Sequence, residues 1–308
     1  MTRVLVTGGA GFIGSNLVRG LLERGDSVRV LDNFSTGNRA NLAGLDVEIV
    51  EGELRSYERV HNAVGGVELV YHLGALGSVP RSVQDPLTSS AVNVEGTLNV
   101  LLAARDEGIR RVVFSSSSSV YGNTSQLPAK ETLPPDPISP YGVAKLAAER
   151  YCVSFSRVYA GFEAVVLRYF NVFGERQSPF SEYAAVVPRF VTAIAAGEPV
   201  TIYGDGEQSR DFTYVGNVVD ATVRAGHAAG ASGRIFNVAA GAPGSVNLLA
   251  DTIGELLDHE VAKQYTEPRS GEIRNSWAAI DEARDVLGYE PSVDLREGLR
   301  KTVDFLRG

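Results

Sequence analysis

The sequence predicts an α/β protein with a doubly wound parallel sheet and a smaller C-terminal α/β domain. Short apolar segments alternate with helical segments through the first half of the chain, as in parallel sheets that are covered on both faces. After Asn171 the alternation loosens, and glycine-rich and proline-rich connections interrupt it. We therefore expect two domains separated by a cleft, formed by residues 1–170 with about 213–240, and by residues 171–212 with 241–308.

The first expected strand, Val4 to Thr7, runs directly into the turn Thr7-Gly8-Gly9-Ala10-Gly11-Phe12-Ile13-Gly14. Gly8, Gly11 and Gly14 allow the backbone to turn tightly, to approach a pyrophosphate closely and to pack the next helix against the sheet. The free N–H groups at the start of that helix are suited to bind phosphate. The turn therefore predicts a dinucleotide site of the Rossmann type.

A helix and a second strand complete this predicted unit. Ile13, Leu17 and Leu21 repeat at four-residue spacing, which indicates a helix, and the apolar segment from Val28 leads to Asp32. An acid at this position accepts hydrogen bonds from the ribose hydroxyls of adenosine and repels a 2′-phosphate. Asp32 therefore favours NAD over NADP.

Further strands and helices follow in alternation. The sequence predicts strands at Val47–Val50, Val67–Leu73, Val112–Ser115 and Ala164–Arg168. It predicts helices at about Tyr57–Val64, Val92–Glu107, Tyr141–Tyr159, Ala184–Ala195, Asn217–Ala228 and Ser245–Leu257.

The composition of the 308 residues argues against several functions. A net charge of -8 and a pI near 5.2 disfavour nucleic acid and anionic membranes as partners. The first strand begins by Arg3 and no apolar run is long enough to span a membrane, so we expect neither a signal peptide nor a membrane segment. The single Cys152 cannot form a disulfide within the chain, which favours a reducing, cytoplasmic location. The histidines lack metal-ligand spacing, so we expect no metal site.

Two residues on one face of a predicted helix have the chemistry of a proton-transfer site. Tyr141 and Lys145 are four residues apart, so their side chains lie together. A phenol is a poor base at its free pKa of about 10, but a neighbouring ammonium and a positive nicotinamide favour the phenolate. Such pairs are also common on exposed helix surfaces, so the pair alone does not indicate catalysis.

A run of serines supplies a second element. The strand from Arg111 to Phe114 leads directly into Ser115-Ser116-Ser117-Ser118-Ser119-Val120-Tyr121-Gly122. This places hydroxyl groups at the carboxyl edge of the sheet, where ligands bind in open α/β sheets. A serine run would also suit a flexible loop, but here a strand precedes it and an apolar segment follows it.

A set of segments spread over nearly the whole chain carries a family resemblance. The segments are Thr7 to Gly14, Asp32, His72-Leu73-Gly74-Ala75, Asn93-Val94-Glu95-Gly96-Thr97, Ser115 to Gly122, Tyr141 to Lys145, Arg168-Tyr169-Phe170-Asn171, Arg210-Asp211-Phe212 and Arg269-Ser270-Gly271-Glu272. In this order they resemble the extended short-chain dehydrogenase/reductase family and, within it, the UDP-sugar 4-epimerases.

The resemblance implies NAD as the cofactor, together with the residues that bind it. These are Gly8, Gly11, Phe12, Ile13, Gly14, Asp32, Asn33, Ser35, Glu53, Leu54, Leu73, Gly74, Ala75, Asn93, Ser115, Tyr141, Lys145 and Tyr169. Two positions depart from the family pattern. Glu53 stands where an Asp is usual before a branched residue, and Ala279 stands where an Asp is frequent.

The resemblance also implies a catalytic set and a UDP-sugar site. Tyr141 is the implied base, Lys145 orients the nicotinamide ribose and tunes Tyr141, and Ser117 bonds the reacting sugar oxygen. The implied substrate site contains Ser117, Asn171, Val187, Tyr203, Arg210, Arg269 and Ser276. The two arginines and Asn171 hold the diphosphate, and Tyr203 contacts the uracil. The implied reaction inverts C4 of the sugar through a 4-keto intermediate.

Other reactions and roles remain open at this point. Sugar nucleotide dehydratases and decarboxylases of the same family carry an acid just before Val-Tyr-Gly, where this chain has Ser118 and Ser119. A non-catalytic NAD-sensing regulator would be expected to lack Tyr141 or Lys145, and both are present.

The identity of the sugar is also open. Segments 75–82 and 171–177 are similar to bacterial UDP-N-acetylglucosamine 4-epimerases, and strict galactose-type epimerases tend to have a bulky Tyr in place of Ser276. UDP-glucuronate 4-epimerases commonly place an Arg near Ser178, although Arg81 or Arg176 could substitute. The resemblance further implies a homodimer that forms through the helices near Val92–Glu107 and Tyr141–Tyr159.

Overall fold

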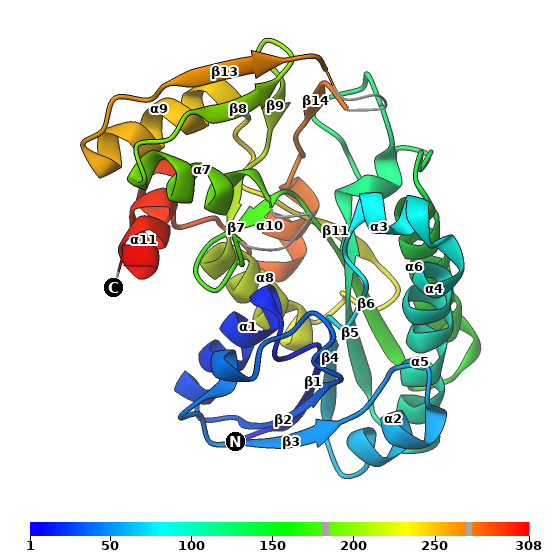
Figure 1. Ribbon diagram of the computed structural model, residues 1–308. Coiled ribbons are helices and arrows are strands. Elements are labelled where there is room, and N and C mark those ends of the chain that lie inside the picture. Colours follow the sequence, from blue (N-terminus) through cyan, green and yellow to red (C-terminus); the bar gives the residue numbers. More distant parts are fainter. Residues whose placement is uncertain (180–184, 269–272, 308) are drawn as a thin grey trace.

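The computed structural model describes residues 1–179, 185–268 and 273–307. Its centre is a seven-stranded, all-parallel sheet in the order β11-β6-β5-β4-β1-β2-β3, shown in Figure 1. The strands are β1 (Arg3–Thr7), β2 (Ser27–Asp32), β3 (Val47–Glu51), β4 (Leu69–His72), β5 (Arg111–Ser117), β6 (Glu163–Tyr169) and β11 (Ile235–Val238). The α/β, doubly wound fold predicted from the sequence is confirmed.

Helices cover both faces of this sheet because its strands are apolar on both sides. On one face α1 (Phe12–Glu23) packs against α8 (Val215–His227). On the other, α5 (Gly96–Asp106) packs against α2 (Tyr57–Val64) and α6 (Pro140–Val158) (Figure 1). Separate buried clusters fill the two interfaces.

The strand register brings the chemically active segments to one edge. Thr7 pairs with His72, His72 with Phe114, and Ser117 with Tyr169. The carboxyl ends of β1, β4, β5 and β6 therefore lie side by side, and the glycine turn, the 73–76 loop and the serine run all leave the sheet there.

Two features of this lobe differ from the sequence prediction. The helix expected over Val92–Glu107 begins as a π-helical segment, Ala91–Glu95, and becomes α-helical as α5. Before it lie two short helices that were not predicted, α3 (Val79–Gln84) and α4 (Pro86–Ser90). They form because Ser78 caps the first and Asp85 ends the first and caps the second.

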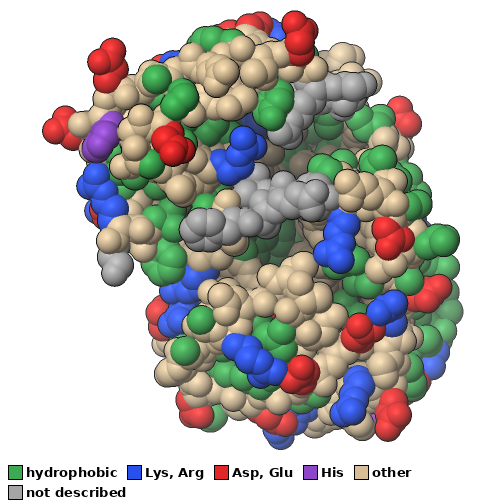
Figure 2. Space-filling model, in the orientation of Figure 1, with side chains coloured by type: hydrophobic (Ala, Val, Ile, Leu, Met, Phe, Trp, Pro, Cys, Tyr) green, Lys and Arg blue, Asp and Glu red, His purple; other side chains and the backbone are tan. Residues whose placement is uncertain are grey.

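The C-terminal lobe has its own core and small sheets. Its helices are α7 (Val186–Ala195), α9 (Val246–Leu257) and α11 (Leu295–Arg307), whereas α10 (Asp281–Leu287) packs against α8 and β11 of the seven-stranded sheet. Its strands are β7 (Val172–Phe173), β8 (Val200–Tyr203), β9 (Ser209–Arg210), β10 (Thr213–Tyr214), β12 (Gly244–Ser245), β13 (Lys263–Thr266) and β14 (Asn275–Ser276). Phe173, Phe190 and Leu249 are buried in this core. Figure 2 shows the molecular surface hollowed between the two lobes.

The helices predicted near 217–228 and 245–257 are present as α8 and α9. The helix predicted over Ala184–Ala195 begins at Val186, and residue 184 lies outside the described residues. Among the helices that the structure describes, none has the length and apolar character needed to cross a membrane.

Candidate active site

The glycine turn after β1 is packed so closely that side chains are excluded from it. Gly8 has a φ of +70°, and a Cβ added there would lie 2.7 Å from the Cα of Gly74. A Cβ at Gly14 would lie 2.1 Å from the carbonyl oxygen of Gly8. The first close approach joins the loops after β1 and β4, and the second seats α1 against the turn. Both positions therefore require glycine.

The start of α1 suits a phosphate. The N-cap residue of α1 is Gly11, and among the described residues no side chain caps the N–H groups at the start of the helix. The first turn of α1 contains no acidic residue. The N–H groups of a helix start carry partial positive charge and need acceptors. The pyrophosphate of NAD would supply them, so the turn that contains Gly8, Gly11, Phe12, Ile13 and Gly14 fits this cofactor.

Asp32, at the end of β2, is buried and already bonded within the protein. Its Oδ2 accepts the N–H of Ala10 at 2.9 Å, and its Oδ1 accepts the N–H of Phe34 at 2.8 Å. A carboxylate accepts about four hydrogen bonds. Asp32 can therefore still accept ribose hydroxyls while it braces the glycine turn from the side.

The loop after β4 is fixed by polar side chains beneath it. The Thr7 hydroxyl accepts the N–H of Gly74 at 3.1 Å. Asn93 accepts the N–H of Leu76 at 2.9 Å and donates to its carbonyl oxygen at 3.2 Å. The buried Asn93 thus uses its side-chain amide to hold the loop that contains Leu73, Gly74 and Ala75. It was predicted as a cofactor-binding residue, and in the structure its amide bonds the loop backbone.

Other predicted cofactor residues are engaged with neighbours. Asn33 Oδ1 accepts from the Ser35 hydroxyl at 2.8 Å, and both residues are exposed. Leu54 packs against Gly74. The Glu53 carboxylate pairs with Arg55 at 2.5 Å.

Tyr169 is a buried residue of β6 whose phenol is directed away from the serine run. Its hydroxyl bonds Thr222 of α8 at 2.7 Å. The strand register nevertheless places its backbone beside Ser117. Its phenol therefore supports the packing of α8 on the sheet.

The structure brings the three predicted catalytic residues together. Tyr141 and Lys145 lie on the first turns of α6, and the Lys145 ammonium donates to the carbonyl oxygen of Ser115 at 2.8 Å. The ammonium nitrogen lies 5.9 Å from the centroid of the Tyr141 ring. The Ser117 hydroxyl, at the end of β5, lies close enough to Tyr141 to lower the pKa of its phenol, while its own hydrogen is donated to the Ser119 hydroxyl at 3.1 Å. The three predicted residues thus share the carboxyl edge of the sheet.

Burial dominates the electrostatics of this group. It raises the pKa of Tyr141 to about 12, and the Ser117 hydrogen bond only partly opposes it. It lowers the pKa of Lys145 to about 8, against the influence of Cys152 and Glu149. The expected lowering of the Tyr141 pKa by Lys145 is therefore not present in the protein alone.

A cavity of about 300 Å³ in the C-terminal lobe contains most of the predicted substrate residues. Asn171, Val187, Tyr203 and Arg210 line it. Asn171 adopts a left-handed φ of +30°, which turns the chain out of β6. Arg210 donates to two backbone carbonyl oxygens, those of Ser209 at 2.8 Å and Arg274 at 3.1 Å. Ser276 is the register partner of Arg210 across β14 and β9.

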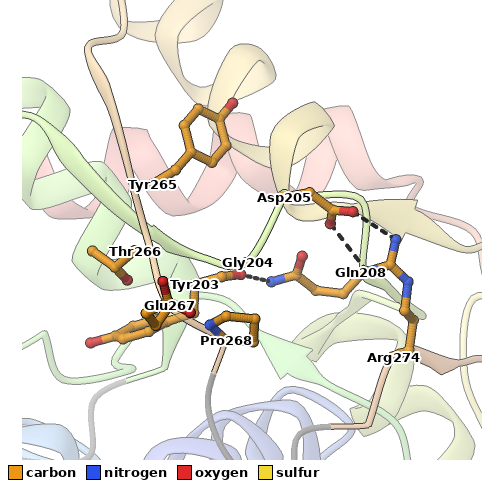
Figure 3. A pocket seen from close by; sticks show the side chains of 9 residues that line it. All are labelled: Tyr203, Gly204, Asp205, Gln208, Tyr265, Thr266, Glu267, Pro268 and Arg274. Carbon is orange, nitrogen blue, oxygen red and sulfur yellow. Dashed lines mark hydrogen bonds and ion pairs between the residues drawn. The ribbon is translucent and has the colours of Figure 1, made fainter.

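A second cavity, of about 570 Å³, shares Tyr203 and Gln208 with the first (Figure 3). Gln208 donates to the carbonyl oxygen of Tyr203 at 2.8 Å. Arg274 and Asp205, which also line the larger cavity, form an ion pair at 2.8 Å. Tyr203 lies between the two cavities, as a residue that contacts a base would. The predicted Arg269 follows the second cavity's Pro268 in sequence and lies outside the described residues.

Sequence reasoning missed two groups at the site. Arg189 of α7 lines the smaller cavity. Glu149, four residues after Lys145, is fully buried beside the serine run and pairs with Arg168 of β6. The spacing of Tyr141, Lys145 and Glu149 on one helix face was the available signal. Within residues 1–179, 185–268 and 273–307, no cluster of three His, Cys, Asp or Glu side chains could hold a metal.

Comparisons with known proteins agree with this geometry. Residues 4–239 match the NAD dependent epimerase/dehydratase family, which confirms the NAD prediction. The chain is 40% identical to a UDP-glucose 4-epimerase of Mycolicibacterium smegmatis, over 99% of this chain and 98% of that protein. It is 38% identical to the crystal structure of a Thermotoga maritima UDP-glucose 4-epimerase with UDP-glucose, with a TM-score of 0.95 and coverage of 99% and 98%.

A third similar structure is that of a Thermus thermophilus UDP-glucose 4-epimerase in complex with NAD, at 38% identity, a TM-score of 0.92 and 99% coverage of both chains. Further matches, at 30% to 38% identity over at least 98% of this chain, are named UDP-N-acetylglucosamine 4-epimerase, UDP-glucuronate 4-epimerase and UDP-glucuronic acid decarboxylase. The similarity therefore extends to proteins with several sugars and two reaction types.

Proposed function

The chain belongs to the NAD dependent epimerase/dehydratase family, and on that premise we propose that it is a UDP-sugar 4-epimerase. The observation that carries the proposal is the junction of Tyr141, Ser117 and Lys145 at the carboxyl edge of the sheet, next to a serine run without an acid. Tyr141 and Ser117 can move a proton on a sugar hydroxyl, and an elimination would need a further acid and base there.

In this proposal NAD, when bound, supplies an acceptor and then a donor of hydride at C4 of the sugar. The glycine turn and Asp32 hold its pyrophosphate and ribose. Tyr141 would accept the proton of the 4-hydroxyl as C4 gives up a hydride, and Ser117 would bond the oxygen of the resulting ketone. Tyr141 would return the proton to that oxygen when C4 is reduced from its opposite face. The net reaction inverts C4 without consuming cofactor.

The charge state of Tyr141 sets a condition on this step. With burial raising its pKa to about 12, the phenol is the dominant form at neutral pH in the protein alone. A positive nicotinamide beside the phenol favours the phenolate. Tyr141 would thus ionise to the phenolate only when the oxidised cofactor is bound, and it would remain a neutral phenol in its absence.

Inversion also requires that the keto sugar turn over while the nucleotide stays anchored. The smaller cavity supports this division. Arg210 and Asn171 line the part that would hold the diphosphate, and Tyr203 lies between the two cavities where the uracil would lie. Arginine donors to a diphosphate are charge-assisted and strong. An anchor at this end leaves the sugar free to present either face.

We infer that the sugars are glucose and galactose and, because Ser276 is small, also their N-acetylated forms. The alternative, UDP-glucuronate, needs a cation for its carboxylate. The Arg176 guanidinium instead donates to Asn16 of α1 at 2.6 Å and lies 5.3 Å from the Phe305 ring, so it is directed toward α1. Arg81 remains the candidate for an acidic sugar.

The test is a product analysis with UDP-glucose, UDP-N-acetylglucosamine and UDP-glucuronate assayed side by side. We expect the 4-epimer of the first two by NMR, with no net change in NADH absorbance. Release of carbon dioxide would identify a decarboxylase, and a 4-keto-6-deoxy product would identify a dehydratase. Absence of turnover with all three, in protein that binds NAD, would favour a regulator.

We also propose a homodimer, through a face that includes the helix predicted at Tyr141–Tyr159 and, in place of the helix predicted at Val92–Glu107, the two short helices α3 and α4 that precede it. Large apolar side chains are exposed on three adjoining helices, among them Val83 of α3, Leu87 of α4 and Val143 of α6, with 63%, 83% and 52% of their surface exposed. Clustered exposed apolar residues mark interaction sites. Light scattering should give a dimer for the natural chain and a monomer for Leu87→Glu/Val143→Glu.

The lone buried Cys152 supports the proposed cytoplasmic location.

A further inference from the structure

We propose that Glu149 and Arg168 are positioning residues for the active site: the pair fixes α6 against the serine run and keeps the Lys145 side chain protonated. The inference rests on the proposed function for its meaning, since Lys145 matters only if Tyr141 moves a proton. Its evidence is a buried network that contacts two consecutive serines of the run, Ser115 and Ser116.

The pair is fully enclosed, and its polar atoms are bonded to neighbours except for Arg168 Nη1, which is buried without a hydrogen-bond partner among the described residues. Glu149 and Arg168 are 0% and 1% exposed. Glu149 Oε1 accepts from Arg168 Nε at 2.9 Å and from the Ser116 hydroxyl at 2.5 Å, and its Oε2 accepts from Arg168 Nη2 at 2.7 Å. The guanidinium also stacks on the ring of Tyr121 at 4.6 Å. Buried ion pairs seldom stabilise a fold more than apolar residues would, so retention of one points to positioning.

Two residues of α6 contact consecutive serines of β5. Lys145 donates to the Ser115 carbonyl oxygen at 2.8 Å, and Glu149 accepts from the Ser116 hydroxyl at 2.5 Å. Tyr141 lies one turn before Lys145 on the same helix. Loss of the Glu149 contact would allow the helix to slide or rotate relative to β5, and Tyr141 and Lys145 would move with it.

Charges around Lys145 give the pair its second role. The groups that face the ammonium are Tyr141, Glu149 and Cys152 from α6, His72 from β4, Phe114 and Ser115 from β5, and Arg168 beyond Glu149 on β6. Burial lowers the pKa of His72 to about 3 and raises the pKa of the Cys152 thiol, so both are neutral near pH 7. The nearby anion is therefore Glu149, and Arg168 balances it.

This arrangement makes a prediction that a purely structural ion pair does not. Removal of the Glu149 charge leaves Arg168 as an unbalanced cation and should lower the pKa of Lys145 from about 8. Removal of the Arg168 charge leaves Glu149 as an unbalanced anion and should raise the pKa of Lys145. Removal of both charges should bring it back toward the natural value.

The experiment measures the protonation of Lys145 directly and needs no epimerase activity. The 13Cε chemical shift of Lys145, assigned by the loss of its signal in Lys145→Met, is followed by NMR across pH in the natural chain, Glu149→Gln, Arg168→Met and the double variant. We expect the midpoint to fall by roughly one pH unit or more in the first variant, a tenfold change in the protonation equilibrium. It should rise in the second and recover in the double variant.

Two further variants serve as controls. Tyr151→Phe alters an exposed side chain on the same helix and should leave the midpoint unchanged. Glu149→Asp keeps the charge but shortens the reach to Ser116, so it should keep the midpoint while lowering kcat at unchanged KM. Midpoints that stay fixed, or that move in the same direction in both single variants, would overturn the inference. If Glu149→Gln does not fold, Arg168→Met and the double variant still decide it, and lack of epimerisation would count only against the proposed function.

Discussion

At the cofactor end of the proposed site, buried partners hold the catalytic residues in place. At the substrate end, the corresponding residues lie on two-residue strands beside open cavities. Lys145, Glu149 and Ser115 are almost completely buried and joined by bonds of 2.5 to 2.9 Å to β5 and β6. Arg210 and Ser276 lie on β9 and β14, which pair only with short neighbours.

The difference matches what each end has to do. Proton transfer requires groups held within a fraction of an ångström, because misplacement of a catalytic group slows the reaction steeply. Turnover of a sugar requires an anchor for the nucleotide and space for the ring. A rigid end and a loosely built end are therefore both needed for the proposed epimerisation, which acts on both faces of one carbon.

The largest expected effect tests the rigid end. Tyr141→Phe removes the acid/base group without removing the ring, so kcat should fall by roughly 10² to 10⁴ while NAD and UDP-sugar still bind. Steady-state kinetics with titration of both ligands measure this. Tyr151→Phe, on an exposed part of the same helix, should leave kcat unchanged. Activity of Tyr141→Phe within a few-fold of the natural chain would remove Tyr141 from the mechanism.

A second prediction concerns the cost of the rigid end to stability. Burial holds the pKa of Lys145 at about 8, below its ordinary value of 10.5. Between these pH values the unfolded chain retains a proton that the folded chain has lost, so the free energy of unfolding should rise with pH, by at most about 3 kcal/mol.

Urea unfolding of the natural chain at pH 7.5 and 10 measures this rise. Lys145→Met should abolish that part of the pH dependence, because the group that titrates is gone. Lys301→Met, on α11 near Glu297, should retain it. An identical pH dependence in the natural chain and Lys145→Met would show that the ammonium is not destabilised by burial.

The loosely built end should respond differently to the loss of an anchor. A diphosphate clamp acts on the ground state and transition state alike, so Arg210→Ala should raise KM by roughly tenfold to a hundredfold and lower kcat less. Arg296→Ala, which removes an exposed ion pair with Glu255, is the matched control. A collapse of kcat at unchanged KM would assign Arg210 to the chemistry instead.

The smallest effect concerns the sugar pocket. Ser276→Tyr should reduce kcat/KM for UDP-N-acetylglucosamine by roughly tenfold to a hundredfold and largely spare UDP-glucose, because a packed phenol would occupy space for the acetyl group. Ser276→Ala should leave the ratio of the two sugars unchanged. An unchanged ratio in Ser276→Tyr would show that this residue does not determine substrate size.

The rigid end was also the more predictable from sequence. Strand periodicity, the glycine turn and the spacing of Tyr141 and Lys145 are local patterns, and the structure contains each of them. The contacts between these segments, in contrast, join residues that are far apart in the sequence. Glu149 meets Arg168 only because β6 lies beside β5, and β11 enters the sheet 66 positions after β6 ends, counting from Tyr169 to Ile235.

At the substrate end the residues were predictable from sequence, but the directions of most of their side chains were not. Arg176 was a candidate ligand for an acidic sugar, yet its contact with Asn16 is made across 160 residues of chain. Two-residue strands such as β9 and β14 lack any periodicity that could reveal them. Their pairing joins Ser209 to Asn275 and Arg210 to Ser276, residues far apart in the chain, and such contacts depend on the finished fold.

The double use of Asp32 has a consequence for how cofactor preference could change over evolution. The carboxylate that would discriminate against a 2′-phosphate also accepts the Ala10 and Phe34 N–H groups beside the glycine turn. A single substitution that admits the phosphorylated cofactor would also leave both donors without their acceptor and loosen the pyrophosphate site. A switch of preference in this lineage would therefore need a compensating change in the loop before or together with the loss of Asp32.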